Sequence, residues 1–94
     1  MDITKCLTIS SAHISGDTAR KLSIEPDTNI LGLSVYEKGE YGWWVYIGNK
    51  LENISDDLPD DLMRCICEAF AWDCQWLCID CDGEEVPGLP IYDW

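Results

Sequence analysis

The stretch S-D-D-L-P-D-D-L-M-R-C-I-C-E-A-F, residues 55–70, predicts the most secure element of the fold, an amphipathic helix. Ser55 is a helix-capping residue, Pro59 suits the first turn, and the aspartates favour the positive end of the helix dipole. The apolar side chains recur at steps of three and four residues, which predicts one core-facing stripe. That stripe consists of Leu58, Leu62, Cys65, Ile66, Ala69 and Phe70.

The segment before this helix, residues 29–48, predicts a β-hairpin. Apolar side chains alternate along both arms, and E-K-G-E at residues 37–40 supplies the turn. The alternating set consists of Leu31, Leu33, Val35, Trp43, Val45 and Ile47. The off-phase set, which belongs on the opposite face of the hairpin, consists of Tyr36, Trp44 and Tyr46.

Shorter patterns on either side complete the set of elements. Residues 6–10 and 76–80 read as strands, and Ser15 caps a short helix that ends before Pro26. The order β-α-β-β-α-β predicts an α+β fold, a two-layer sandwich with two helices on one face of a four-stranded sheet. A chain of 94 residues encloses one core, so residues 1–94 are expected to form a single domain.

A ferredoxin-like strand order would make the first and last strands antiparallel neighbours. The end of the first strand would then meet the beginning of the last. This arrangement would bring His13 close to residues 74–78 and Cys6 close to Cys81. It depends on the register, because a slip of one residue would turn these side chains to the other face.

The charge of the chain limits the partners it can bind. The formal net charge is −12 at pH 7, and from residue 52 onward there are twelve acidic side chains and one basic side chain, Arg64. Binding to nucleic acid or to an anionic membrane depends on Lys and Arg, so the composition argues against both as direct partners. Imitation of nucleic acid stays open. No segment has the length of a membrane span, and residues 1–5 lack the signal-peptide pattern, so a cytoplasmic location is expected.

Five of the six cysteines lie between residues 65 and 81, which suggests a site for a soft metal ion. Residues 78–81 form a C-x-x-C pair. Tetrahedral zinc takes four nitrogen or sulfur ligands and stabilises small domains, so a structural zinc is expected. The predicted ligands are His13, Cys74, Cys78 and Cys81, with Cys6 in reserve. The alternative is that the thiols are ordinary core residues, as expected for Cys65 on the helix stripe.

Enzymatic interpretations of the same residues are weaker. A redox role for C-x-x-C is disfavoured, because thioredoxin-like motifs begin a helix, whereas this motif follows a predicted strand. Nucleophilic chemistry with His13, or acid–base chemistry at Asp80 and Asp82, stays open, but no nucleophile signature or triad accompanies these residues. A non-enzymatic binding protein is the leading prediction. The alternative is a small thiol- or metal-dependent enzyme or regulator that uses Cys78 and Cys81.

Aromatic side chains suggest how such a protein would bind. If helices cover only one face of the sheet, four aromatic residues line the open face, and exposed Trp and Tyr anchor protein interfaces. These residues are Tyr36, Trp44, Tyr46 and Trp76. Some of them would instead pack under the C-terminal segment, with Trp94 as a lid. The expected partner is a basic protein surface, such as a groove that normally holds nucleic acid, bound through Trp44, Tyr46, Asp56, Asp57, Asp60 and Asp61. A homodimer across the same face is the competing arrangement.

Three stretches carry a resemblance to a known group of proteins. They are I-S-S-A-H-I-S at residues 9–15, Y-E-K-G-E-Y-G-W at residues 36–43 and W-L-C-I-D-C-D-G-E-E at residues 76–85. The chain resembles small acidic proteins of gut Firmicutes and their mobile elements, and it is similar to zinc-containing type II-A anti-CRISPR proteins. The resemblance implies an inhibitor that acts in a bacterial host cell. It would block target-DNA loading by a CRISPR effector nuclease, and His13 and the cysteines would be structural metal ligands.

Overall fold

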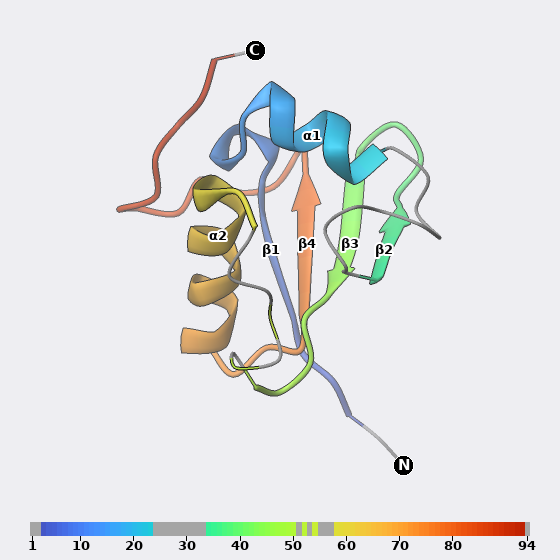
Figure 1. Ribbon diagram of the computed structural model, residues 1–94, viewed down its shortest axis with the longest axis vertical. Helices are drawn as coiled ribbons and strands as arrows, with labels where there is room; N and C mark the ends of the chain where they lie inside the picture. Colours follow the sequence, from blue (N-terminus) through green and yellow to red (C-terminus); the bar gives the residue numbers. More distant parts are fainter. Residues whose placement is uncertain (1–2, 24–33, 51, 53, 55–57, 94) are drawn as a thin grey trace.

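The computed structural model describes residues 3–23, 34–50, 52, 54 and 58–93. In chain order the elements are β1 (Cys6–Ser10), the 3₁₀ turn η1 (Ser11–His13), α1 (Gly16–Ser23), β2 (Ser34–Glu37), β3 (Gly42–Tyr46), α2 (Asp60–Ala71) and β4 (Trp76–Asp80) (Figure 1). The predicted order β-α-β-β-α-β and the α+β class are confirmed. Residues 29–33 of the predicted hairpin and the predicted cap Ser55 lie outside the described residues.

The four strands are arranged in the order β1-β4-β3-β2, which differs from the ferredoxin-like order. β4 is antiparallel to β3 but parallel to β1, so Cys6 lies beside Trp76 and Ser10 beside Asp80. The expectation of antiparallel first and last strands is therefore wrong. The burial of the two strands accounts for the order. β4 is buried from Leu77 to Asp80 and occupies an interior position, whereas β1 is buried only at Ile9 and Ser10 and forms an edge.

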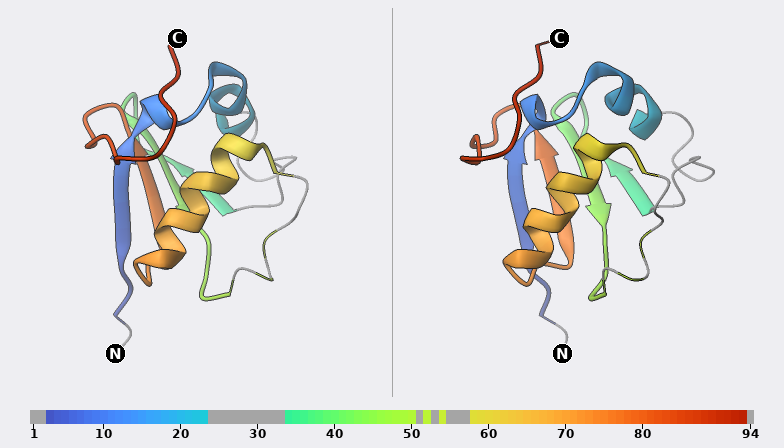
Figure 2. Two further views of the ribbon diagram at one scale, coloured as in Figure 1. Left: turned by 90° about the vertical axis from the view of Figure 1, so that its left-hand side faces the viewer. Right: turned by 60° about the vertical axis from the view of Figure 1, so that its left-hand side comes forward.

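Both helices lie on the same side of the sheet, as predicted (Figure 2). α2 runs along the sheet, and α1 crosses the end at which β1 and β4 terminate (Figure 1). The most deeply buried hydrophobic side chains are Ile9, Ile14, Leu22, Val45, Leu62, Cys65, Ile66, Ala69, Leu77, Cys78 and Ile79. The predicted stripe is confirmed from Leu62 to Ala69, while Leu58 is buried just before the helix begins at Asp60. No helix in the described part of the chain is long and apolar enough to cross a membrane.

Asp61 joins the beginnings of the two helices. Its carboxylate accepts hydrogen bonds from the Ser15 N–H at 2.7 Å and from the Thr18 hydroxyl at 2.9 Å, and the residue is only 8% exposed. The Ser15 hydroxyl in turn accepts from the Thr18 N–H at 3.3 Å, which confirms Ser15 as the cap of α1. Burial by itself raises the pKa of Asp61, but the hydrogen bonds from Ser15, Thr18 and Leu62 outweigh burial and lower the pKa below its ordinary value.

We expect Asp61→Asn to lower the free energy of unfolding at pH 7 by about 2 kcal/mol, because the charged acceptor of two hydrogen bonds is lost. The folded pKa lies below the ordinary value of 3.8, so ionised Asp61 stabilises the fold above that value and loses this effect as the pH falls through the folded pKa. Urea denaturation of wild type and variant should therefore converge in strong acid. The exposed neighbour Asp60→Asn is the matched control and should change stability little. An equal loss in both variants would contradict this role of Asp61.

His13 holds the C-terminal segment against η1. The imidazole is 1% exposed, its Nε2 accepts from the Val86 N–H at 2.8 Å, and its Nδ1 lies 2.9 Å from the Pro90 carbonyl oxygen. Since a carbonyl only accepts, Nδ1 carries the proton and Nε2 does not. Two backbone hydrogen bonds extend the attachment, from the Ser10 N–H to the Glu84 carbonyl and from the Tyr92 N–H to the Ala12 carbonyl. His13 is thus a structural residue at the end of β1.

Candidate functional site

The sheet face opposite the helices, called here the open face, carries the aromatic side chains that alternation predicted. Trp44 lies between Tyr36 and Cys78, and Tyr46 lies beside Trp76. Tyr36 is 55% exposed, Trp44 40% and Tyr46 42%. The Trp76 ring contacts Tyr46 at 5.1 Å and Tyr36 at 6.0 Å between centroids, and a shallow groove of about 430 Å³ runs between Tyr36, Trp44 and Trp76. The predicted aromatic face is confirmed for the described residues, and Trp94, the predicted lid, lies outside them.

A lysine at the margin of this face was predicted only as a turn residue. The Lys38 ammonium lies 2.6 Å from the Asp80 carboxylate, 3.7 Å from the Cys78 sulfur and 5.5 Å from the centroid of the Trp44 ring. The hydrogen bond from Lys38, with a second from the Asp82 N–H, lowers the pKa of Asp80, and the same bond raises the pKa of Lys38. The pair is therefore charged on both sides near neutral pH. The sequence could have predicted that Lys38 lies on the open face, since it is two residues from Tyr36 and therefore in phase with it.

The two cysteines of the C-x-x-C motif have different surroundings. Cys78 is 1% exposed and pairs with Trp44 on the open face. Cys81 follows the end of β4, three residues on, with its N–H bonded to the Tyr41 carbonyl. Cys78 is buried and Cys81 is exposed, and both are free thiols, so the two cysteines are not joined as a disulfide. Burial raises the pKa of the Cys65 thiol to about 12, in agreement with its expected place in the core.

The predicted zinc ligands do not converge. Both ring nitrogens of His13 are engaged by backbone groups, and Cys74 and Cys81 flank opposite ends of β4. Six residues, five of them in β4, lie between Cys74 and Cys81 and separate the two positions by roughly 20 Å, so one ion cannot reach both thiols. The parallel pairing also places His13 away from residues 74–78, and Cys6 lies beside Trp76 rather than near Cys81. The ligand set His13, Cys74, Cys78 and Cys81 therefore does not fit a tetrahedral site.

One group of three donors does come together among the described residues. The ligand atoms of Asp80, Cys81 and Asp82 lie within 4.8 Å of one another. One Asp80 oxygen already accepts from Lys38 and the other from the Asp82 N–H, so this carboxylate is occupied by protein partners. Cys81 and Asp82 are exposed. These three side chains are of the types that bind metal ions. The Asp80 carboxylate, however, already has protein hydrogen-bond partners for both of its oxygens, so it does not need a metal ion.

We expect a strong chelator to leave the melting temperature of the purified protein within about 2 °C of its untreated value, because no buried donor of the predicted set needs an ion. The measurement is a thermal melt before and after chelation, with elemental analysis of the same sample. A known zinc-finger domain treated in parallel shows that the chelator is active. Near-stoichiometric zinc together with a large loss of melting temperature would contradict the side-chain arrangement described above.

The four aspartates predicted for partner binding have different situations. Asp60 is exposed in the first turn of α2 and is available to a partner. Asp61 is buried, and its carboxylate accepts hydrogen bonds from Ser15 and Thr18, so its role is internal to the fold. Asp56 and Asp57 lie outside the described residues. Charge reversal at Asp61 would therefore disturb the fold before it reported on binding.

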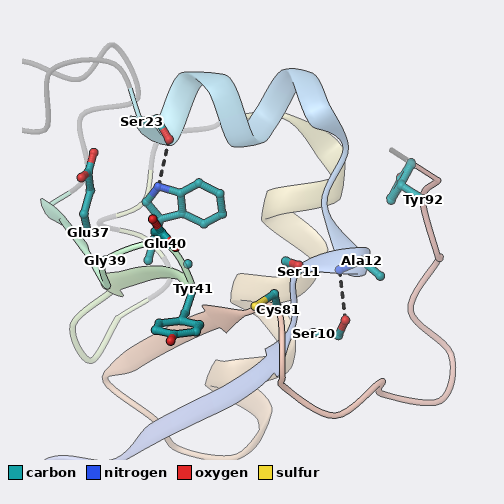
Figure 3. A pocket seen from close by; sticks show the side chains of 12 residues that line it. Ser10, Ser11, Ala12, Ser23, Glu37, Gly39, Glu40, Tyr41, Cys81 and Tyr92 are labelled. Carbon is teal, nitrogen blue, oxygen red and sulfur yellow. Dashed lines mark hydrogen bonds between the residues drawn. The ribbon is translucent and has the colours of Figure 1, made fainter.

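A second concave region, called here the polar cleft, opens at the end of the sheet where β1 and β4 terminate (Figure 3). It has a volume of about 580 Å³. The residues that give it its character are Ser23, Glu37, Glu40, Tyr41, Trp43 and Cys81. The sequence did not predict this cleft, because its walls come from separate parts of the chain: the end of β1 with η1, the end of α1, the β2–β3 hairpin, and the segment after β4. Only the acidic turn E-K-G-E pointed to one of them.

The chain belongs to a family of unknown function, DUF5983, whose C-terminal domain matches residues 6–94. The match begins at the first residue of β1 and includes every described element of the fold. No curated protein and no solved structure matches the chain.

Proposed function

We propose that this protein is a non-enzymatic binding protein that docks on a basic protein surface through its open face. The observation that carries the proposal is the cluster of Tyr36, Trp44, Tyr46 and Trp76, with three of these rings between 40% and 55% exposed. Large aromatic side chains that stay exposed on a rigid sheet are typical anchors of protein interfaces, since little conformational entropy is lost when they are covered.

Charge decides which occupant suits the face. The net charge of −12 attracts a basic partner and speeds its association, whereas two copies of this chain repel each other. On the face itself Asp80 is neutralised by Lys38, so the net charge of −12 comes from other parts of the chain. An aromatic face on a strongly acidic protein complements a partner surface that is apolar in the middle and rich in Lys and Arg.

A protein groove that normally holds nucleic acid has this chemistry. By covering it, the protein would act as an inhibitor of nucleic-acid loading, imitating phosphate charge with carboxylates. The resemblance to type II-A anti-CRISPR proteins makes a type II CRISPR effector nuclease the first partner to test. Bound zinc, which the same resemblance implies, is not required for this mode of binding.

The test compares two variants of the exposed aromatic residues. We expect the double variant W44S/Y46S to weaken binding to the nuclease about 100-fold, since interface aromatics carry a large share of binding energy. Trp72→Ser is the matched control, because Trp72 is 62% exposed but follows the end of α2, away from the open face. Binding is measured by surface plasmon resonance with and without guide RNA, together with target-DNA loading.

Three outcomes would count against the proposal. Equal losses in W44S/Y46S and Trp72→Ser would show that the open face is not the interface. If an unrelated basic protein without a nucleic-acid groove bound equally well, charge attraction alone would account for the binding. A concentration-dependent dimer in sedimentation experiments that W44S/Y46S abolishes would mean that a second copy of the chain covers the face.

A further inference from the structure

We infer that the polar cleft is a binding site for a guanidinium cation. The site lies at the end of the sheet and uses no aromatic residue of the open face, so it is separate from the proposed interface. Its position has a structural cause. After β1 the chain turns through η1 into α1, and the cleft lies between the end of β1 with η1, the end of α1, the β2–β3 hairpin and the residues after β4 (Figure 1).

The electrostatics of the cleft favour a cation. Of the 12 residues that line it, Glu37 and Glu40 carry charged carboxylates and none is basic. The lysine of the same turn, Lys38, directs its ammonium away to Asp80 on the open face. Ser23, the last residue of α1, contributes its hydroxyl to the lining, whereas the basic residues in the last turn of this helix, Arg20 and Lys21, do not line the cleft. The two glutamates thus act on one volume whose lining residues include no basic side chain.

The walls favour a flat cation with many donors. Trp43 and Tyr41 offer aromatic faces, and a planar guanidinium stacks on such faces while its five N–H groups reach carboxylates and hydroxyls. Figure 3 shows Glu37 and Glu40 rising from the hairpin turn, with the Tyr41 ring below them and Ser23 above. An ammonium group has only three N–H donors and is not planar, so it would form fewer hydrogen bonds in the cleft and would not stack on its aromatic rings.

The cleft is formed in advance of any ligand. The Trp43 indole N–H donates to the Ser23 hydroxyl at 3.2 Å, which ties the aromatic wall to α1. The turn is closed by the Lys38 N–H on the Gly42 carbonyl at 2.8 Å and by the Tyr41 N–H on the Lys38 carbonyl at 3.0 Å. The Tyr41 carbonyl accepts from the Cys81 N–H at 2.8 Å and joins this turn to the end of β4. Binding therefore costs little reorganisation of the walls.

The experiment is an NMR titration of the intact protein with N-ethylguanidinium and with the neutral, similarly shaped N-ethylurea. We expect saturable shifts of the Trp43 indole N–H and the Tyr41 and Cys81 amides with the cation alone, at a dissociation constant of about 1 mM. The double variant E37Q/E40Q should weaken binding about tenfold. The double variant E84Q/E85Q removes the same charge from exposed positions that do not line the cleft, and it should keep nearly the wild-type affinity.

The outcomes separate the inference from its alternatives. Equal shifts with N-ethylurea, equal weakening in both double variants, or no saturation by about 50 mM cation would each overturn it. Wild-type affinity of W44S/Y46S for the cation would show that the cleft works independently of the open face. Free arginine and a Gly-Arg-Gly peptide then distinguish the source of the guanidinium: tighter binding of the peptide assigns a partner's arginine side chain, and tighter binding of free arginine assigns a small molecule.

Discussion

Gly42→Ala is expected to prevent the protein from folding. Gly42 begins β3 with a φ of +156°, and a Cβ added to it would lie 1.7 Å from the Ile79 carbonyl oxygen and 2.8 Å from its carbonyl carbon. Both atoms belong to the backbone of β4, so neither can move without separating the two central strands. The cost exceeds about 4 kcal/mol, which is most of the stability of a small domain. Far-UV circular dichroism and a proton–nitrogen correlation spectrum should show an unfolded chain.

Gly39→Ala is the matched control in the same hairpin. Gly39 has a φ of +56°, but a Cβ at this position would have nothing within 4 Å. Only the strain of a left-handed conformation remains, about 1 kcal/mol, so this variant should fold. A folded Gly42→Ala protein with wild-type dispersion of its amide signals would contradict the close approach of β3 to β4.

His13→Ala has the second largest expected effect, a loss of about 3–4 kcal/mol in the free energy of unfolding. The change leaves a cavity in the core and removes the hydrogen-bond partners of the Val86 N–H and the Pro90 carbonyl. The C-terminal segment should then separate from η1 before the sheet unfolds. Urea denaturation gives the loss, and hydrogen exchange of the Val86 amide shows whether it is local.

The substitution His13→Gln tests the assignment further, because the glutamine amide offers both a donor and an acceptor. It should recover part of the stability if the two backbone bonds are what matter. A zinc ligand would behave differently, since the loss of one ligand would make the protein insensitive to chelators while wild type remained sensitive. An Ala variant within 1 kcal/mol of wild type would contradict the structural role of His13.

The local elements of this fold could be predicted because their signals are local. The stripe of α2 and the alternation of Tyr36, Trp44 and Tyr46 follow from side-chain periodicity, and each ended on the expected face. The sheet order could not be predicted in this way. The position of β4 between β1 and β3 depends on which strand gains most from burial on both faces, which is a comparison across the whole chain.

The candidate site shows the same division. The aromatic residues of the open face were predicted, whereas the direction of β4 was not, and that error moved His13 and the cysteines to the wrong neighbours. The partners of His13 are backbone atoms of Val86 and Pro90, which no pattern of side chains reveals. The polar cleft was missed for a related reason, because segments that lie far apart in the sequence form it together.

The interior position of β4 bears on how the protein forms during its synthesis. Of the described strands β4 is synthesised last, yet it is the neighbour of both β1 and β3. Until residues 76–80 emerge, β1 has no partner in the sheet and the β2–β3 hairpin has one uncovered edge. A nascent or truncated chain thus presents unpaired strand edges and exposed aromatic rings, which are features that promote aggregation and degradation. The sheet can therefore form completely only after β4 has been synthesised.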